Sequence, residues 1–312
     1  MSSSPSPIRS LAMIGLGRMG ANMSRRLARH GFVVHGFDGD PEARQKLGDE
    51  PGVTTHASLA QALAQRSAPR VVWLMLPAGE ITDATIGEAA DLLAPGDLIV
   101  DGGNANYLDS QRRGAMLGER GIGFVDCGVS GGVHGLANGY CLMLGGQDRF
   151  IALLDGVIRA LAPASGQGWA HCGAVGAGHF AKMVHNGIEY GMMQALAEGF
   201  ALLTRRSDLI SDPAGIAHAW REGSVIRSWL LDLTAQALDD PQALAEAAPF
   251  VADSGEGRWT VDEAIRQGTP IPAIAAALFA RFDSQGHADP ANRLLAMMRR
   301  GFGGHAVRTT GT

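Results

Sequence analysis

Residues 176–192 carry an unusual number of polar side chains at the start of an otherwise apolar stretch with helical spacing. At about 100° per residue, one face of a helix would present an amine, an imidazole, an amide, a carboxylate and a phenol. These groups belong to Lys182, His185, Asn186, Glu189 and Tyr190. Two turns, roughly 10 Å of helix rise, would separate the amine from the carboxylate, which is enough to straddle a small sugar acid.

A lysine and a glutamate placed in this way could act as base and acid. A desolvated Lys182 could accept a proton near neutral pH, and Glu189 beside apolar walls could keep a proton to donate. The alternative is a solvated polar face with pairs at i,i+3 and i,i+4. The apolar flanks, and glycines at 176, 178 and 187 that permit close approach, favour the catalytic interpretation.

Residues 11–20 contain the pattern G-x-G-x-x-G directly after a predicted strand and at the start of a predicted helix. Gly15 allows a tight turn, Gly17 lets the backbone approach a pyrophosphate, and Gly20 permits close helix–strand packing. The helix N-terminus would offer amide groups and the positive end of its dipole to the phosphates. We therefore predict a dinucleotide site formed by Gly15, Leu16, Gly17, Arg18, Met19, Gly20, Asp38 and Asn104.

Asp38 follows the second predicted strand, where a carboxylate can accept hydrogen bonds from ribose hydroxyls and repel the 2′-phosphate of NADP. The alternative is a turn-capping role, although Asp40 is the better candidate for the helix cap. Arg44, one turn further on, could weaken the discrimination. The expected cofactor is NAD, with NADP possible and less favoured.

Two further segments could hold a substrate. Asn104 follows a predicted strand at 98–101, where doubly wound folds place ligands, and its amide can donate and accept. Ser130, Gly131 and Gly132 could present consecutive amides to a carboxylate. A capped strand-to-helix turn and a flexible loop are the respective alternatives.

The elements that must position these groups follow two patterns. Up to about residue 175, short apolar runs alternate with amphipathic segments, which predicts a Rossmann-like, doubly wound α/β domain with a mostly parallel sheet over residues 1–175. After that the strand pattern ends, and residues 176–312 are predicted to form an all-helical domain, starting with a long helix at 178–205. The predicted strands are 11–14, 32–37, 71–76, 98–101, 123–126, 141–144 and 169–172. The predicted helices between them are 19–29, 41–47, 58–65, 81–93, 107–120 and 149–161.

Composition excludes several other classes of protein. Of 312 residues 46% are hydrophobic, which is too high for a disordered chain, and the 43 glycines follow no collagen period. A net charge of −5 argues against a nucleic-acid binder, and no apolar run is long enough to cross a membrane. Three widely spaced cysteines and the lack of a His/Asp ligand cluster suggest a cytoplasmic protein without a metal site.

The combination of residues 15–20, Asp101-Gly-Gly-Asn104, Gly128-Val-Ser-Gly-Gly132 and Lys182-Met-Val-His-Asn-Gly-Ile-Glu-Tyr190 resembles the decarboxylating 6-phosphogluconate dehydrogenase family. The resemblance extends from residue 11 to His305. The last motif separates this family from the wider β-hydroxyacid dehydrogenases, which share the Ser-Gly-Gly turn and the lysine but usually show only K-x-x-x-N.

The resemblance implies a role for each group. Lys182 would be the general base for the C3 hydroxyl, and Glu189 the general acid that protonates C1 of the enediol. Hydride would pass from C3 to the nicotinamide, the 3-keto acid would lose C1 as carbon dioxide, and ribulose 5-phosphate would result without a metal. The implied substrate-binding residues are Asn104, Ser130, Gly131, Gly132, His185, Asn186 and Tyr190.

The resemblance also points to the phosphate end of the substrate and to a neighbouring subunit. Arg258 stands where the family usually has lysine, and Arg281 matches a second phosphate contact. Arg299 and His305 match a tail motif that reaches the active site of a partner, which implies a homo-oligomer, a dimer or a tetramer. Solvated surface arginines and a frayed terminus are the alternatives.

We therefore predict an NAD-preferring, short-chain 6-phosphogluconate dehydrogenase of sugar-acid metabolism. One rival is a 3-hydroxyisobutyrate-type dehydrogenase with a smaller, unphosphorylated substrate. Arg258, Arg281 and the Glu189–Tyr190 pair oppose it. The other rival is a catalytically silent dinucleotide-binding regulator, which would need neither Lys182 nor Glu189.

Overall fold

The computed structural model describes residues 8–64, 68–303 and 306–308. The chain divides into two compact units, Met1–Met183 and Val184–Thr312. The division falls inside the long helix α9 (Ala177–Arg205), so the first two turns of this helix belong to the first unit.

In the described part of the first unit, eight strands form one sheet in the order β3-β2-β1-β4-β5-β6-β7-β8. Neighbouring strands are parallel except β6 and β7, which are antiparallel. The predicted Rossmann-like, mostly parallel sheet is confirmed. The strands are β1 (Ser10–Ile14), β2 (Val33–Phe37), β3 (Val53–Thr55), β4 (Val71–Leu74), β5 (Leu98–Asp101), β6 (Gly123–Ser130), β7 (Cys141–Gly146) and β8 (Trp169–Gly173).

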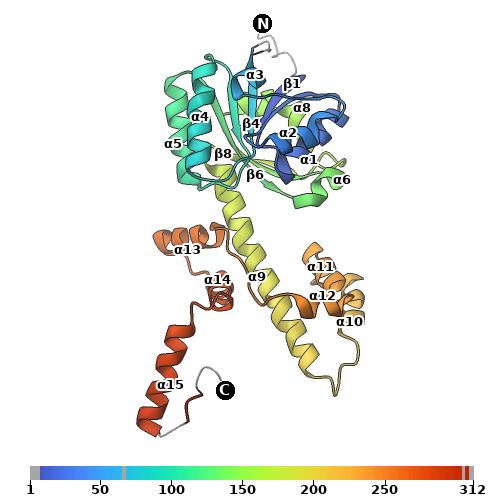
Figure 1. The fold of residues 1–312 in the computed structure, drawn as a ribbon, viewed down its shortest axis with the longest axis vertical. Helices are drawn as coiled ribbons and strands as arrows, with labels where there is room; N and C mark the ends of the chain where they lie inside the picture. The colour runs from blue at the N-terminus through green and yellow to red at the C-terminus, as the bar shows by residue number, and fades with distance from the viewer. Residues whose placement is uncertain (1–7, 65–67, 304–305, 309–312) are drawn as a thin grey trace. The chain divides into compact units, whose positions relative to one another are not determined.

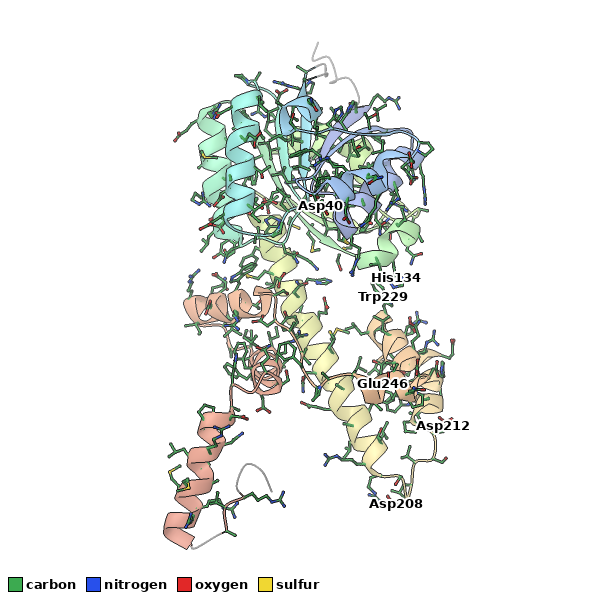
Figure 2. The ribbon with its side chains drawn as sticks, viewed as in Figure 1. Asp40, His134, Asp208, Asp212, Trp229 and Glu246 are labelled. Carbon is green, nitrogen blue, oxygen red and sulfur yellow. The ribbon has the colours of Figure 1, made fainter. Side chains whose placement is uncertain are left out.

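Helices connect these strands, and most begin and end within a residue or two of the predicted positions. Asp40 caps α2 as expected, because its carboxylate accepts the amide of Glu42 at 2.9 Å (Figure 2). The single helix predicted at 149–161 is instead two, which meet at Leu154. The helices are α1 (Arg18–Arg29), α2 (Pro41–Gly48), α3 (Leu59–Leu63), α4 (Glu80–Leu92), α5 (Tyr107–Glu119), the 3-10 turn η1 (Gly132–His134), α6 (Gly135–Asn138), α7 (Asp148–Leu153) and α8 (Asp155–Leu161).

The sheet has one apolar core on each face. Successive side chains of a strand point to opposite faces, so Leu11 and Met13 join one core while Ala12 and Ile14 join the other. Helices α1, α7 and α8 complete the first core, and α3, α4 and α5 complete the second (Figure 1). The sequences of these strands are almost continuously apolar because both faces of the sheet are buried.

In the second unit every described element is a helix, in agreement with the predicted all-helical half. Its buried clusters are small, one around Phe200 and Leu231 and one around Tyr190 and Leu278. No helix within the described residues is long and apolar enough to cross a membrane. After α9 come α10 (Pro213–Arg221), α11 (Trp229–Leu238), α12 (Pro241–Glu246), α13 (Glu256–Gln267), α14 (Pro272–Ser284) and α15 (Asp289–Gly303).

The first turns of α9 lie very close to β6 and β7. A Cβ at residue 178 would come within 2.6 Å of the carbonyl oxygen of Asp126 and 2.8 Å of the amide nitrogen of Gly145. Both of these are backbone atoms that cannot move aside. Glycine at this position therefore lets the helix pack directly on the sheet.

We predict that Gly178→Ala destabilises the protein by about 1–3 kcal/mol, because overpacking forces backbone shifts. Gly199→Ala on the same helix is the control, since a Cβ there meets nothing within 4 Å. That change should be neutral or stabilise by up to about 1 kcal/mol, because alanine replaces glycine in a helix. Denaturant unfolding of both variants tests this, and equal stabilities would contradict the close approach.

Candidate active site

The turn between β1 and α1 requires glycine for two reasons internal to the protein. Gly15 has a φ of 90°, and its amide donates to the carbonyl oxygen of Phe37 at 2.8 Å. A Cβ at residue 20 would overlap the carbonyl oxygen of Gly15. The positive φ and the close helix approach together hold the turn in one shape.

The surroundings of Gly17, at the N-terminus of α1, differ from those of Gly15 and Gly20. Its φ is −60°, and a Cβ there would meet no described atom within 4 Å, so packing does not require glycine. As N-cap of α1 it supplies no side-chain hydrogen bond, and the first turn of that helix holds no acidic residue. Open space beside uncapped amides at a helix N-terminus fits the pyrophosphate of a dinucleotide.

Asp38 stands beside this turn. Its Oδ2 accepts the amide of Leu16 at 2.6 Å, and its Oδ1 accepts the amide of Asp40 at 2.8 Å. Each oxygen retains a lone pair for a ribose hydroxyl. Arg44 Nη1 donates to the carbonyl oxygen of Asp38 at 2.6 Å, so the two residues expected to affect cofactor choice are neighbours.

Asn104 follows a turn that a buried ion pair stabilises. Arg113 Nη1 donates to Asp101 Oδ2 at 2.9 Å, and the other carboxylate oxygen accepts the amide of Gly103 at 3.3 Å. Both charged side chains are 1% exposed, whereas Asn104 itself is exposed. The turn therefore presents Asn104 at the carboxyl end of β5.

Asp83 on α4 is the second acidic partner of Arg113, whose Nε donates to Asp83 Oδ1 at 2.7 Å. Burial alone would raise the pKa of Asp83, but hydrogen bonds from Arg113 and Arg112 lower it overall. The sequence analysis did not predict these ion pairs, because they join residues about 30 positions apart in the chain.

The Ser130–Gly132 segment is a sharp turn at the end of β6. Gly131 and Gly132 have φ values of 132° and 52°, both in the region that favours glycine. The ring of Tyr140, fully buried, lies under this turn, with its Cδ1 3.3 Å from where a Cβ of Gly131 would stand. Burial raises the pKa of Tyr140 to about 12, with the nearby Arg26 charge opposing. The turn is therefore built on a neutral, packed ring.

Asp126 joins the sheet to the start of α9. Its carboxylate, fully buried, accepts the amides of Gly176 at 2.6 Å and His179 at 2.7 Å. Burial raises the pKa of Asp126, while His179 and the two amide bonds act in the opposite direction. His179 Nδ1 lies 2.7 Å from Ser110 Oγ, so α5 holds the same turn. The sequence contained one signal for this: an acidic residue inside an apolar strand.

Lys182 lies one turn further along α9 and is 8% exposed, as predicted for a desolvated lysine. A Cβ at residue 128 would overlap the Cβ of Lys182, so the helix passes directly over β6 at this point. Gly128 is two residues before Ser130. The structure thus brings the predicted base next to the strand that ends in the predicted carboxylate loop.

Further along α9, in the second unit, three of the predicted groups lie together. His185 Nδ1 is 3.0 Å from Asn186 Oδ1 and 3.9 Å from Glu189 Oε2. The side chains of His185 and Glu189 are each 38% exposed, whereas Asn186 is buried. This arrangement leaves the imidazole and the carboxylate accessible to a ligand.

Tyr190 belongs to a separate basic cluster of the second unit. The guanidinium of Arg281 stacks 3.5 Å above the ring of Tyr190, and Arg258 lies 4.5 Å above the ring of Phe282. Arg258 also forms an ion pair with Asp253. Tyr190, a predicted substrate-binding residue, and Arg281, a predicted phosphate contact, therefore touch each other.

Of the two predicted tail residues, Arg299 lies within the described part of the chain. Arg299 lies on α15 with an exposed side chain, and His305 lies outside the described residues. Their predicted placement in the active site of a partner stays a prediction.

Two family models cover almost the whole chain. The NAD binding domain of 6-phosphogluconate dehydrogenase matches residues 10–176, and the 6-phosphogluconate dehydrogenase C-terminal domain matches residues 178–305. The chain belongs to the 6-phosphogluconate dehydrogenase family. The resemblance noted in the sequence is confirmed.

Members of the family with similar sequences include both short and long chains. An NAD(+)-dependent, decarboxylating 6-phosphogluconate dehydrogenase of Haloferax volcanii is 39% identical over 95% of this chain and 98% of its own. A decarboxylating 6-phosphogluconate dehydrogenase of Staphylococcus aureus is 36% identical over 88% of this chain, but only 61% of its own length is covered. The chain therefore matches a family member of its own length.

Solved structures agree on the fold. The 6-phosphogluconate dehydrogenase of Plasmodium falciparum superposes with a TM-score of 0.83 at 26% identity, over 97% of this chain and 67% of that one. A 3-hydroxyisobutyrate dehydrogenase of Mycobacterium tuberculosis gives 0.72 at 25% identity, over 90% of this chain and 94% of that one. The architecture is shared by both classes of enzyme, so the side chains must distinguish them.

Gly17→Ala tests the pyrophosphate site. We expect folding stability to be nearly unchanged, because the added Cβ meets no described protein atom. The affinity for NAD should fall roughly tenfold or more, because the methyl group occupies space that the phosphates need. Titration calorimetry measures the affinity.

Gly20→Ala provides the contrast, because its Cβ would overlap backbone within the protein and the folded state itself should be destabilised. If Gly17→Ala binds NAD as tightly as the unaltered protein, the pyrophosphate does not approach residue 17.

Proposed function

We propose that this chain is an NAD-preferring 6-phosphogluconate dehydrogenase that oxidises and decarboxylates 6-phosphogluconate to ribulose 5-phosphate and carbon dioxide. The observation that carries the proposal is α9, which the buried Asp126 carboxylate holds against the dinucleotide-binding sheet. This helix carries a buried lysine, an accessible imidazole about one turn later and an accessible carboxylate about two turns later. The chain also belongs to the family of that name.

Lys182 is the proposed base for the C3 hydroxyl. It is one of only two lysines among the 26 lysine and arginine residues of the chain. The other, Lys46, is a surface residue whose side chain is 74% exposed. Arginine cannot lose its proton near neutral pH, so at position 182 lysine can act as a base where arginine could not. The bound nicotinamide supplies the hydride acceptor.

Oxidation at C3 places a ketone β to the C1 carboxylate, and this makes the next step easy. The C1–C2 bond breaks, carbon dioxide leaves, and the electron pair remains on the enediol. Glu189, 3.9 Å from His185, is the proposed acid that delivers a proton to the carbon that lost the carboxylate, which is C2 of the substrate and C1 of the enediol. His185 and Asn186 would orient the sugar hydroxyls between the two catalytic groups.

The remaining predicted residues would hold the two ends of the substrate. Amides of the Ser130–Gly132 turn, with Asn104, are suited to the carboxylate end. At the phosphate end, Arg281 and Tyr190 already form one stacked pair, which presents cationic charge beside a hydroxyl. Arg258 would join them by exchanging Asp253 for the phosphate. A substrate with no phosphate would leave this cluster without a role, which disfavours the 3-hydroxyisobutyrate alternative.

NAD is the proposed cofactor. Asp38 presents a carboxylate beside the glycine turn, where the 2′-phosphate of NADP would meet like charge. Arg44 donates to backbone carbonyls of the same turn, and this occupies part of its guanidinium. The Asp38 carboxylate is therefore the group proposed to decide the preference for NAD over NADP.

A homo-oligomer, cytoplasmic as expected from composition, is also proposed. The second unit exposes large apolar side chains on α9, α11 and the segment between α10 and α11, including Trp229, labelled in Figure 2. Val225 is 100% exposed and Leu202 is 68% exposed. A second copy of the chain would cover these residues, and its Arg299 and His305 would then reach the substrate.

Turnover tests the proposal. With 6-phosphogluconate and NAD, we expect a rise in nicotinamide absorbance at a rate typical of enzymes, about 1–1,000 per second. 3-Hydroxyisobutyrate should give little or none. Activity with 3-hydroxyisobutyrate and none with 6-phosphogluconate would overturn the proposed substrate.

Two lysine variants separate the catalytic role from charge. Lys182→Met should abolish hydride transfer, and Lys182→Arg should as well, because the positive charge remains while the base is lost. Lys46→Arg is the matched control and should retain full activity. Glu189→Gln should severely impair turnover. A near-normal rate for any altered residue of α9 would remove it from the mechanism.

Asp38→Ser tests the cofactor preference. We expect the ratio of kcat/KM for NADP over NAD to rise roughly tenfold or more, because facing like charges cost several kcal/mol. Asp40→Ser removes a charge two residues away and keeps a helix cap, so it controls for net charge. Equal effects of the two substitutions would show that Asp38 does not contact the ribose.

A further inference from the structure

Arg26, on the cofactor helix α1, has a role that neither the fold nor the mechanism above requires. It is 7% exposed, although it lies between exposed or half-exposed arginines at 25 and 29. A buried guanidinium needs hydrogen-bond acceptors for its N–H groups, since desolvation without them costs several kcal/mol. Its partners show what it does.

The guanidinium of Arg26 donates to backbone carbonyls at the C-terminal end of α8 and within the short helix α6. Nε lies 2.9 Å from the oxygen of Ala160, and Nη2 lies 2.7 Å from that of Ala162, both at the end of α8. Nη1 lies 3.2 Å from the oxygen of Leu136, inside α6. A positive charge at the C-terminal ends of helices is favourable, because the last carbonyls lack partners and the dipole is negative there.

Helix α6 is the element that this contact affects most. It has four residues, too few to be stable alone, and it directly follows the Ser130–Gly132 turn and η1. The ring of Tyr140 also packs against it, since a Cβ at residue 135 would overlap that ring. Arg26 is thus a side chain of the cofactor helix that helps to hold the segment following the Ser130–Gly132 turn.

We infer that Arg26 is a positioning residue that sets the Ser130–Gly132 turn relative to the pyrophosphate turn, and thereby the affinity for the substrate carboxylate. Its α1 begins at the pyrophosphate turn, so one rigid helix is tied to both ligand-binding loops. The inference rests on the proposed function, since it takes the Ser130–Gly132 turn to be the carboxylate site.

The expected effect differs between the two ligands. Met23 and Leu27 pack α1 onto the sheet independently of Arg26, so the pyrophosphate turn should keep its shape when the guanidinium is removed. The Ser130–Gly132 turn, in contrast, should shift. A shift of about 1 Å in a group that positions the substrate can lower the reaction rate by up to 100-fold. Loss of Arg26 should therefore weaken substrate binding selectively.

The test compares Arg26→Met with Arg29→Met, an exposed position on the same helix. For Arg26→Met we expect Kd and KM for 6-phosphogluconate to rise roughly tenfold to 100-fold, while Kd for NAD changes by less than about threefold. The control should leave all three values unchanged. Arg26→Lys, which retains the charge with fewer donors, should give an intermediate effect and serves if Arg26→Met does not fold.

Hydrogen exchange of residues 130–140 supplies a readout that does not depend on turnover. Protection of this segment should fall in Arg26→Met and not in Arg29→Met. Unchanged protection with unchanged substrate affinity, or an equal loss of affinity for both ligands, would overturn the inference. If the unaltered protein fails to bind 6-phosphogluconate, the proposed function fails, and the exchange result still decides whether Arg26 positions the turn.

Discussion

Two hydrogen bonds from the buried carboxylate of Asp126 to the amides of Gly176 and His179 determine where α9 begins. A carboxylate at a helix N-terminus is favoured by the free amides and the dipole, and here it offsets the cost of burying a charge. Because a helix is rigid over two turns, placing its first turn also places Lys182. The spacing of the later groups on α9 then follows from the helix itself.

Glycine makes this placement possible. Gly128 and Gly178 remove the side chains that would separate α9 from β6, so the backbone of this helix rests on the backbone of the sheet. Gly15, Gly131 and Gly132 adopt positive φ at the turns proposed to bind ligands. Part of the high glycine content of the chain therefore corresponds to close approaches and turns beside the proposed site, and other glycines form turns elsewhere in the fold.

Much of this could be predicted from the sequence, because the glycine turn, the alternating apolar runs and the polar face of α9 are local patterns. Features that arise from tertiary contacts could not. Strand β3 (Val53–Thr55) is too short to show a period, and the stacking of Arg281 on Tyr190 joins residues far apart in the chain. Arg26 and Arg113 are the second members of two arginine pairs in the sequence, and both are buried in the structure. Helical spacing from Met23 to Arg26 and Leu27 was the available signal.

Helix α9 is proposed to carry both a base and an acid, for one oxidation followed by one decarboxylation. Substrate labelled with carbon-13 at C1 tests this proposal, by comparing the labelled carbon dioxide released with the NAD reduced. We expect one molecule of labelled carbon dioxide for each molecule of NADH. Reduction of NAD without release of the label would show a simple hydroxyacid dehydrogenase and would rule out the proposed decarboxylation.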